Sequence, residues 1–282
     1  NHKRSALKFN SDLKFTMTEN CLKIEVMTEE IETELSRNNL QKVRKIHFKF
    51  ETLDLTDQDW NRVSQVFTEL GTSHPLILQF DSKSTNHSIN NISRLFSIFC
   101  QKPEIIESLL IILNFNNEIM QLMNFIFPQL SILRELQLKL NDADISQKHF
   151  NEFIENLYSV APRLEVLGLS FSGTKLPLSI VKKIFIKMPV LRSFYLYVRK
   201  IPSLNGETIT PLLDDSKNLM PNLERLILDL SQTRIPVSDS AVIKDRFRHI
   251  KDFELILEDP ERERVQNQAS QSQVSPPQGR QV

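Results

Sequence analysis

The stretch Leu133-Arg-Glu-Leu136-Gln-Leu138-Lys-Leu140 begins with an apolar residue and two variable ones, and then alternates between apolar and polar residues. Alternation with a period of two is typical of a β-strand that buries one face. The same arrangement returns in four later stretches, at residues 164–171, 191–198, 223–230 and 250–257. Because one local pattern recurs so often, we expect the chain to be built from repeated structural units.

Three weaker copies of the pattern precede these, around Ile46, Leu76 and Leu109. If the first alternating residue of each copy is its anchor, the anchors are residues 46, 76, 109, 136, 167, 194, 226 and 253. Successive anchors lie 30, 33, 27, 31, 27, 32 and 27 residues apart. A spacing that holds through seven intervals predicts eight strands in register.

Helices are predicted between the strands, because apolar residues there recur at helical spacing. Trp60, Val63 and Phe67 fall on one helical face with Val66 and Leu70, and Thr56 or Asp57 is a candidate N-cap. Similar faces occur at residues 89–99, 150–161 and 181–188, with Ser88 and Ser146 as candidate starts of the first two.

Prolines mark where three of these helices are expected to end. Pro162, Pro189 and Pro221 each lie five residues before an anchor. Proline cannot continue a helix, and it disfavours the helical conformation of the residue before it. The predicted unit is therefore a strand, a loop, a helix and a proline stop.

The run Leu133-x-x-Leu136-x-Leu138-x-x-Asn141 resembles the leucine-rich-repeat signature L-x-x-L-x-L-x-x-N. With a helix in each unit and a period near thirty, residues 41–258 are similar to the ribonuclease-inhibitor-like subclass of that family. The resemblance implies a right-handed α/β solenoid, with a parallel sheet on its concave face and helices on its convex face. The family's asparagine is present at Asn114 and Asn141 but is replaced at Asp81, Ser172, Arg199, Ser231 and Glu258.

The two ends of the chain differ from the repeats. Residues 1–40 are expected to cap the stack, because Leu13–Met17 and Leu22–Val26 both alternate and can form a hairpin around Thr18–Asn20. Residues 259–282 are polar and rich in Gln, Ser and Pro, which predicts a disordered tail. Since the sequence opens with Asn1 rather than Met, we expect it to start inside a longer gene product.

Composition narrows the range of functions. Lys plus Arg and Asp plus Glu both number 35, and the zero net charge disfavours nucleic acid as the main partner. The longest apolar run has the length of a strand, so we expect no membrane span. Two distant cysteines fit a reducing, cytoplasmic setting, and only 5 glycines disfavour a nucleotide-binding fold.

The sequence carries no recognisable catalytic motif. Its six histidines lack metal-ligand spacing, and it contains no nucleophile elbow, phosphate-binding loop or dinucleotide fingerprint. Asp142 and Asp144, and the pair Asp214 and Asp215, are interpreted as solvated carboxylates. We therefore predict that the protein is not an enzyme, and we expect no catalytic residue, metal or cofactor.

Residues that alternate with the apolar ones should face outward from the sheet. Among them Tyr195 and Tyr197 stand out, and the predicted binding residues are these two with Arg192, Arg225, Asp229, Lys139 and Gln137. Tyr and Arg are enriched among the residues that dominate interface energies, although aromatic side chains also favour strands for their own sake. Ile77, Leu110 and Ile112 form a second, apolar region that a neighbouring segment is expected to cover.

These observations favour a scaffold that binds a protein partner on the concave face of the solenoid. One alternative is a structural subunit of a large ciliary or organellar complex. Its basis is an Asn-, Gln-, Lys-, Ile- and Phe-rich composition that resembles proteins from AT-rich protist genomes. Another is the substrate-recognition part of an F-box-type ubiquitin-ligase adaptor, because repeats of this subclass often follow an F-box.

Overall fold

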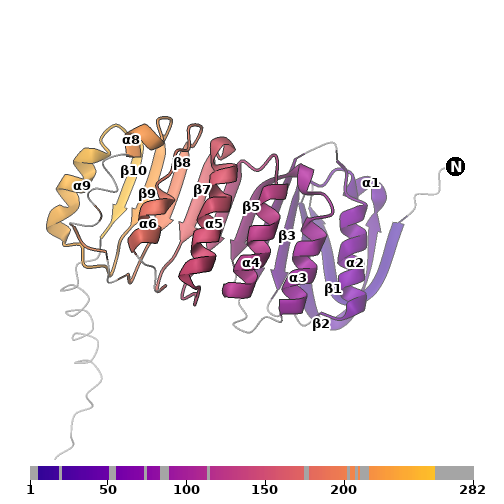
Figure 1. The fold of residues 1–282 in the computed structure, drawn as a ribbon. Coiled ribbons are helices and arrows are strands. Elements are labelled where there is room, and N and C mark those ends of the chain that lie inside the picture. The colour runs from indigo at the N-terminus through magenta and orange to yellow at the C-terminus, as the bar shows by residue number, and fades with distance from the viewer. Residues whose placement is uncertain are drawn as a thin grey trace, which may run out of the picture.

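The computed structural model describes residues 6–18, 21–50, 55–72, 75–82, 89–112, 115–174, 178–201, 204–206, 209 and 216–257. In these ranges strands and helices alternate along the chain (Figure 1). The predicted tail 259–282 lies outside the described residues, as do Ser88, Asn114, Asp214, Asp215 and Glu258.

The strands are β1 (Ala6–Thr18), β2 (Cys21–Ser36), β3 (Lys45–Phe50), β4 (Leu76–Ser82), β5 (Ile106–Ile112), β6 (Glu135–Lys139), β7 (Val166–Ser170), β8 (Ser193–Tyr197), β9 (Arg225–Asp229) and β10 (Asp252–Ile256). The helices are α1 (Arg37–Leu40), α2 (Asp57–Thr68), α3 (Ile89–Phe99), α4 (Asn117–Ile126), α5 (Gln147–Val160), α6 (Leu178–Ile184), α8 (Ser216–Leu219) and α9 (Ser240–Arg246). Short 3-10 turns are η1 (Pro103–Ile105), η2 (Phe127–Gln129), η3 (Ala161–Arg163) and η4 (Val237–Asp239).

All ten strands form one sheet whose spatial order follows the chain order. The hairpin β1–β2 is antiparallel, and every later pair of neighbours is parallel. The prediction of an α/β fold with a mainly parallel sheet is thus confirmed. The eight predicted strands are β3 to β10, and the sheet is longer because both arms of the predicted hairpin join it.

The described helices lie on one face of the sheet. Figure 1 shows α2, α3, α4 and α5 side by side in front of the strands. This arrangement leaves the other face of the sheet, here called the open face, without a described helix.

The core consists of side chains that stack from strand to strand. Leu136 pairs with Leu167, which pairs with Phe194, which pairs with Leu226. Each of these side chains is at most 2% exposed. Burial of one such side chain stabilises the fold by about 1.5–3 kcal/mol. The hairpin belongs to the same core, because Leu22 of β2 pairs with Ile46 and is also buried.

The register of β4 differs from the prediction. Ile46 pairs with Leu78 rather than with Leu76, and Leu78 pairs with Leu109. The anchor of this unit is therefore residue 78, which changes the first two intervals from 30 and 33 to 32 and 31 residues. Period-two alternation could not decide between Leu76 and Leu78, since both are apolar and buried and point to the same side.

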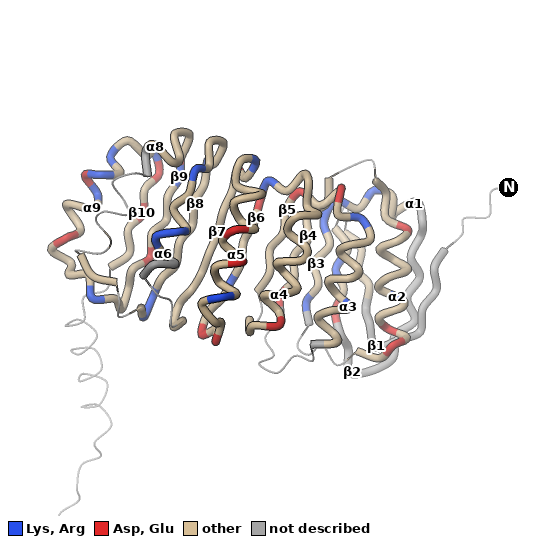
Figure 2. The backbone as a smooth tube through the Cα atoms, in the orientation of Figure 1, with Lys and Arg blue, Asp and Glu red and all other residues tan. Residues whose placement is uncertain are grey.

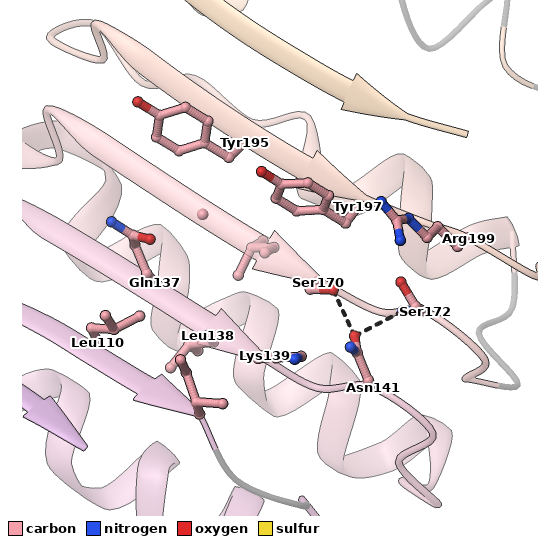
Figure 3. Close-up of a pocket in the computed structure, with 13 residues that line it drawn as sticks. Leu110, Gln137, Leu138, Lys139, Asn141, Ser170, Ser172, Tyr195, Tyr197 and Arg199 are labelled. Atoms are coloured by element: carbon pink, nitrogen blue, oxygen red, sulfur yellow. Dashed lines mark hydrogen bonds between the residues drawn. The ribbon is translucent and has the colours of Figure 1, made fainter. Parts of the chain in front are cut away.

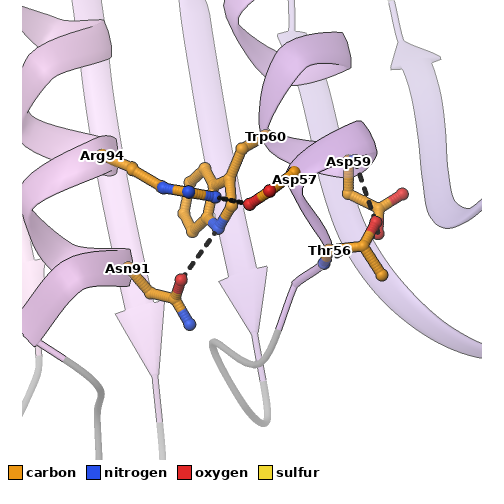
Figure 4. Close-up of polar contacts among 6 residues, drawn as sticks. All are labelled: Thr56, Asp57, Asp59, Trp60, Asn91 and Arg94. Atoms are coloured by element: carbon orange, nitrogen blue, oxygen red, sulfur yellow. Dashed lines mark hydrogen bonds and ion pairs between the residues drawn. The ribbon is translucent and has the colours of Figure 1, made fainter.

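Helix starts follow the predicted caps. The Thr56 side chain caps α2 and forms a reciprocal capping box with Asp59, and Ser146 caps α5. Neighbouring helices are linked by polar contacts: Trp60 Nε1 donates to Asn91 Oδ1 at 3.1 Å, and Arg94 pairs with Asp57 (Figure 4).

Some helices differ from the prediction, and α9 (Ser240–Arg246) was not predicted. Helix α6 ends at Ile184, so Phe185 and Met188 lie beyond it, although both are buried as the pattern required. Helix α4 (Asn117–Ile126) was not predicted, because its apolar side chains follow directly on an apolar strand.

The turn after the strand repeats in four units. Asp142, Gly173, Lys200 and Gln232 all have positive φ, between 50° and 74°. Each turn also donates backbone hydrogen bonds to the next unit, as when Asp142 N donates to Ser172 O at 2.8 Å. Main-chain hydrogen bonds between units therefore satisfy backbone groups in turns that lack an asparagine. Each of the strands β6 to β9 ends one residue before the last apolar residue of its repeated pattern. These four residues are buried in the turns: Leu140, Phe171, Val198 and Leu230.

Truncation of a stacked core side chain should destabilise the whole sheet. We expect Leu167→Ala to lower the free energy of unfolding by about 2–5 kcal/mol, because it removes methyl groups and leaves a cavity in the central strand. The control is Ile77→Ala, whose side chain is 37% exposed on the open face, with an expected change of about 0.5 kcal/mol. Urea denaturation followed by circular dichroism measures both, and equal losses would contradict the stacked core.

Candidate functional site

A hollow lies on the open face over strands β5 to β8. Its volume is about 330 Å³ (Figure 3). This open-face hollow is lined by Leu110, Ile112, Gln137, Leu138, Lys139, Asn141, Gly168, Leu169, Ser170, Ser172, Tyr195, Tyr197 and Arg199. The volume is at the lower end of the range for small-molecule pockets, and the hollow is shallow and open, so it suits a side chain of a partner better than an enclosed ligand.

The hollow exists because Gly168 stands between two larger side chains. In the paired strands, Gly168 lies beside Gln137 on one side and Tyr195 on the other. A Cβ atom at this position would lie 3.0 Å from Gln137 Cγ, which is closer than ordinary contact. The missing side chain leaves the floor of the hollow at the level of the backbone.

Tyr195 and Tyr197 form one wall. Both point out of β8 toward the hollow, and both are half-buried (Figure 3). Neither hydroxyl has a hydrogen-bond partner in the described part of the chain. The guanidinium carbon of Arg225 lies 5.7 Å from the centre of the Tyr195 ring, a cation–π contact. Burial, aided by Asp229, raises the pKa of Tyr197, so its hydroxyl stays protonated and able to donate.

Leu110 and Ile112 form the opposite wall. They were expected to form a separate apolar region with Ile77, but Ile77 does not line the hollow. Ile77 pairs with Ser108 at the other end of the strands, whereas Leu110 pairs with Gln137 and Ile112 with Lys139. The apolar pair and the tyrosines therefore face one hollow from two sides.

The end of the hollow toward the carboxyl ends of the strands is polar. Lys139 is exposed and makes no ion pair in the described ranges. Asn141 Oδ1 accepts hydrogen bonds from Ser170 Oγ at 2.6 Å and from Ser172 N at 3.2 Å. Lys139 can thus meet an anionic group of a partner, while Asn141 Oδ1 is used to hold the turn.

Arg199 completes this end, and sequence reasoning missed it as a site residue. It stands in its unit where Asn141 stands in an earlier one, two residues after Tyr197, and it lines the hollow with the tyrosines. Its Nε donates to Asp229 Oδ2 at 2.5 Å. Asp229 itself is fully buried, and its Oδ1 accepts from Ser231 N at 3.1 Å and Ser231 Oγ at 2.8 Å.

The seven predicted binding residues are thus not equivalent. Gln137, Lys139, Tyr195 and Tyr197 line the hollow, and Arg225 lies against Tyr195. Asp229 is buried, so its role is to hold Arg199 rather than to meet a partner. Arg192 lies just before β8, at the far end of the strands, where it is exposed and pairs with Glu224 at 3.4 Å.

The structure was also searched for a metal site and a membrane span. No group of three His, Cys, Asp or Glu side chains among the described residues is placed to hold a metal ion. None of the helices in the described ranges is long and apolar enough to cross a membrane. Figure 2 shows acidic and basic positions interspersed along the chain, in keeping with the zero net charge.

The chain matches no protein-family model and no curated protein sequence.

The buried carboxylate of Asp229 should matter for stability. We expect Asp229→Ala to lower the free energy of unfolding by about 1.5–3 kcal/mol, because it removes the acceptor for Arg199 and for the buried Ser231 N–H. Asp252→Ala is the matched control: its ion pair with Arg225 is exposed on both sides, and such pairs contribute about 0–1 kcal/mol. Urea denaturation distinguishes the two, and a smaller effect at Asp229 than at Asp252 would refute this reading.

His47 should make stability depend on pH. Burial lowers its pKa from the ordinary value of 6.5, and Lys45 adds to the effect. Its Nε2 is also buried without a hydrogen-bond partner. The unfolded chain therefore binds a proton more readily than the folded one, so stability should be intact at pH 7.5 and should fall as the pH drops below about 6.5. The unfolding midpoint in urea of wild type and His47→Gln at pH 7.5 and 5.5 measures this, and the variant should lose less.

Proposed function

We propose that the chain is a leucine-rich-repeat solenoid that binds a protein partner on the open face of its sheet, with the open-face hollow as the centre of the interface. The proposal rests on one observation above all. Two half-buried tyrosines, whose hydroxyls have no partner among the described residues, face Leu110 and Ile112 across a glycine floor. This arrangement offers apolar contact and free hydrogen-bonding groups within the same small area.

The chemistry of the hollow matches that of an interface centre. Tyrosine supplies a large contact area and loses little conformational entropy, and it is among the residues whose truncation weakens complexes most. The polar groups around it, Gln137, Lys139 and Arg199, can form the rim that excludes water from such contacts. In a leucine-rich-repeat solenoid this face is the concave one, as the spacing of the units and the resemblance imply.

The decisive experiment compares tyrosines on the two faces of the molecule. Full-length protein is used to capture partners, and the captured proteins are quantified by mass spectrometry for wild type, for Tyr195→Ala with Tyr197→Ala, and for Tyr158→Ala. Tyr158 is 44% exposed on α5, on the helical face, and is the matched control. Partners should be lost from the first variant and retained by the second.

For any partner identified in this way, the affinity can be measured by calorimetry. The double tyrosine variant should bind at least about fivefold more weakly, which corresponds to 1 kcal/mol or more. Gly168→Val fills the floor of the hollow and should weaken binding. Because its Cβ would crowd Gln137 Cγ at 3.0 Å, the stability of this variant is measured alongside by urea denaturation. Unchanged affinity in both variants, or loss only with Tyr158→Ala, would refute the site.

A further inference from the structure

The last described strand of the sheet has an outer edge that no other described strand covers. In the described part of the chain, β10 has a neighbour, β9, on one side only. Asp252 N donates to Glu224 O, and Leu230 N donates to Ile256 O, both at 3.0 Å. Since alternate residues of a parallel strand bond to the same neighbour, Asp252, Glu254 and Ile256 direct their backbone groups to β9. The N–H and C=O groups of Phe253 and Leu255 therefore point to the outer edge.

The core side chains of this strand are incompletely covered. Leu226, Leu228 and Leu230 of the preceding unit are at most 2% exposed. Their counterparts Phe253, Leu255 and Leu257 are only partly buried, although they pack against the same core. The end of a repeat stack usually carries polar residues at such positions. Here apolar side chains lie along the same edge as backbone groups that have no partner among the described residues.

The edge has an acidic character toward the open face. Glu254 is exposed and has no ion-pair or hydrogen-bond partner among the described residues. Asp252, two residues before it, pairs with Arg225 on the inner side at 3.0 Å and is itself exposed. A strand placed beside β10 would have residues opposite Glu254 and Asp252 on the open face, and residues opposite Phe253 and Leu255 on the helical face.

We propose that the outer edge of β10 binds an extended segment of another protein as an additional strand, and that this segment alternates basic and apolar residues. Its apolar side chains cover Phe253 and Leu255, its basic side chains meet Glu254 and Asp252, and its backbone bonds the groups that point outward. Phe253 is held for this contact by Phe247, whose ring centre lies 4.9 Å from its own. This edge is separate from the open-face hollow, so either site can fail its test without the other.

A second copy of the chain is a poorer occupant than such a segment. If two β10 strands paired antiparallel about Glu254, Phe253 of one copy would bond to Leu255 of the other. The two Glu254 side chains would then lie directly opposite each other, and like charges in that position are destabilising. A basic residue opposite Glu254 reverses the sign of this interaction.

The test measures amide hydrogen exchange of the full chain by NMR, with a capped hexapeptide of alternating lysine and valine as the probe. With the peptide at ten times its Kd, exchange at the Phe253 and Leu255 amides should slow about tenfold. The Glu254 amide, which already bonds to β9, should change much less. The control peptide has glutamate in place of lysine and should protect neither amide.

The variant Glu254→Lys tests the charge without touching the core, because the side chain is exposed. It should bind the lysine peptide several-fold more weakly and gain affinity for the glutamate peptide. Three results would overturn the proposal: no protection at Phe253 and Leu255, equal binding of both peptides by wild type and variant, or protection of the same amides that rises with protein concentration alone and so reports a second copy.

Discussion

The rest of the structure depends on the stacking of equivalent apolar side chains from one parallel strand to the next. Leu136, Leu167, Phe194 and Leu226 are each buried mainly because the neighbouring unit carries an apolar residue at the same register position. No unit could bury its leucines alone, since a single strand and helix leave most of that surface in water. The same constraint fixes the register, because a shift by one residue would turn every leucine to the open face.

Because the backbone of the units is so regular, the differences that can carry function are confined to outward side chains. At β7 the outward residues are small, Gly168 and Ser170, and they pair with the outward Tyr195 and Tyr197 of β8. A small residue beside two large ones makes the open-face hollow without any irregularity of the strands. At the carboxyl ends of the strands the same regularity brings Arg199 to the buried Asp229, so the proposed binding surface and a structural ion pair lie side by side.

Ion pairs join neighbouring units along the sheet. At the start of the strands Arg134 pairs with Glu165 at 2.7 Å, and Arg192 pairs with Glu224 at 3.4 Å. These pairs are exposed and contribute little each, about 0–1 kcal/mol. Because basic and acidic residues alternate there, the end of the sheet at which the strands start is nevertheless close to neutral. The zero net charge of the chain reflects equal numbers of basic and acidic residues, 35 of each, rather than a lack of charged residues.

The sequence by itself determined the strands, their period, most helices and the buried positions, because periodic burial of apolar side chains is a local pattern that can be read along the chain. It also identified Tyr195, Tyr197, Gln137 and Lys139 as outward residues. Only the tertiary structure decided the register of β4, the placement of Leu110 and Ile112 opposite the tyrosines, the burial of Asp229 and the edge of β10 that no described strand covers. Each of these depends on which residues become neighbours across strands, and that pairing cannot be read from spacing within one strand.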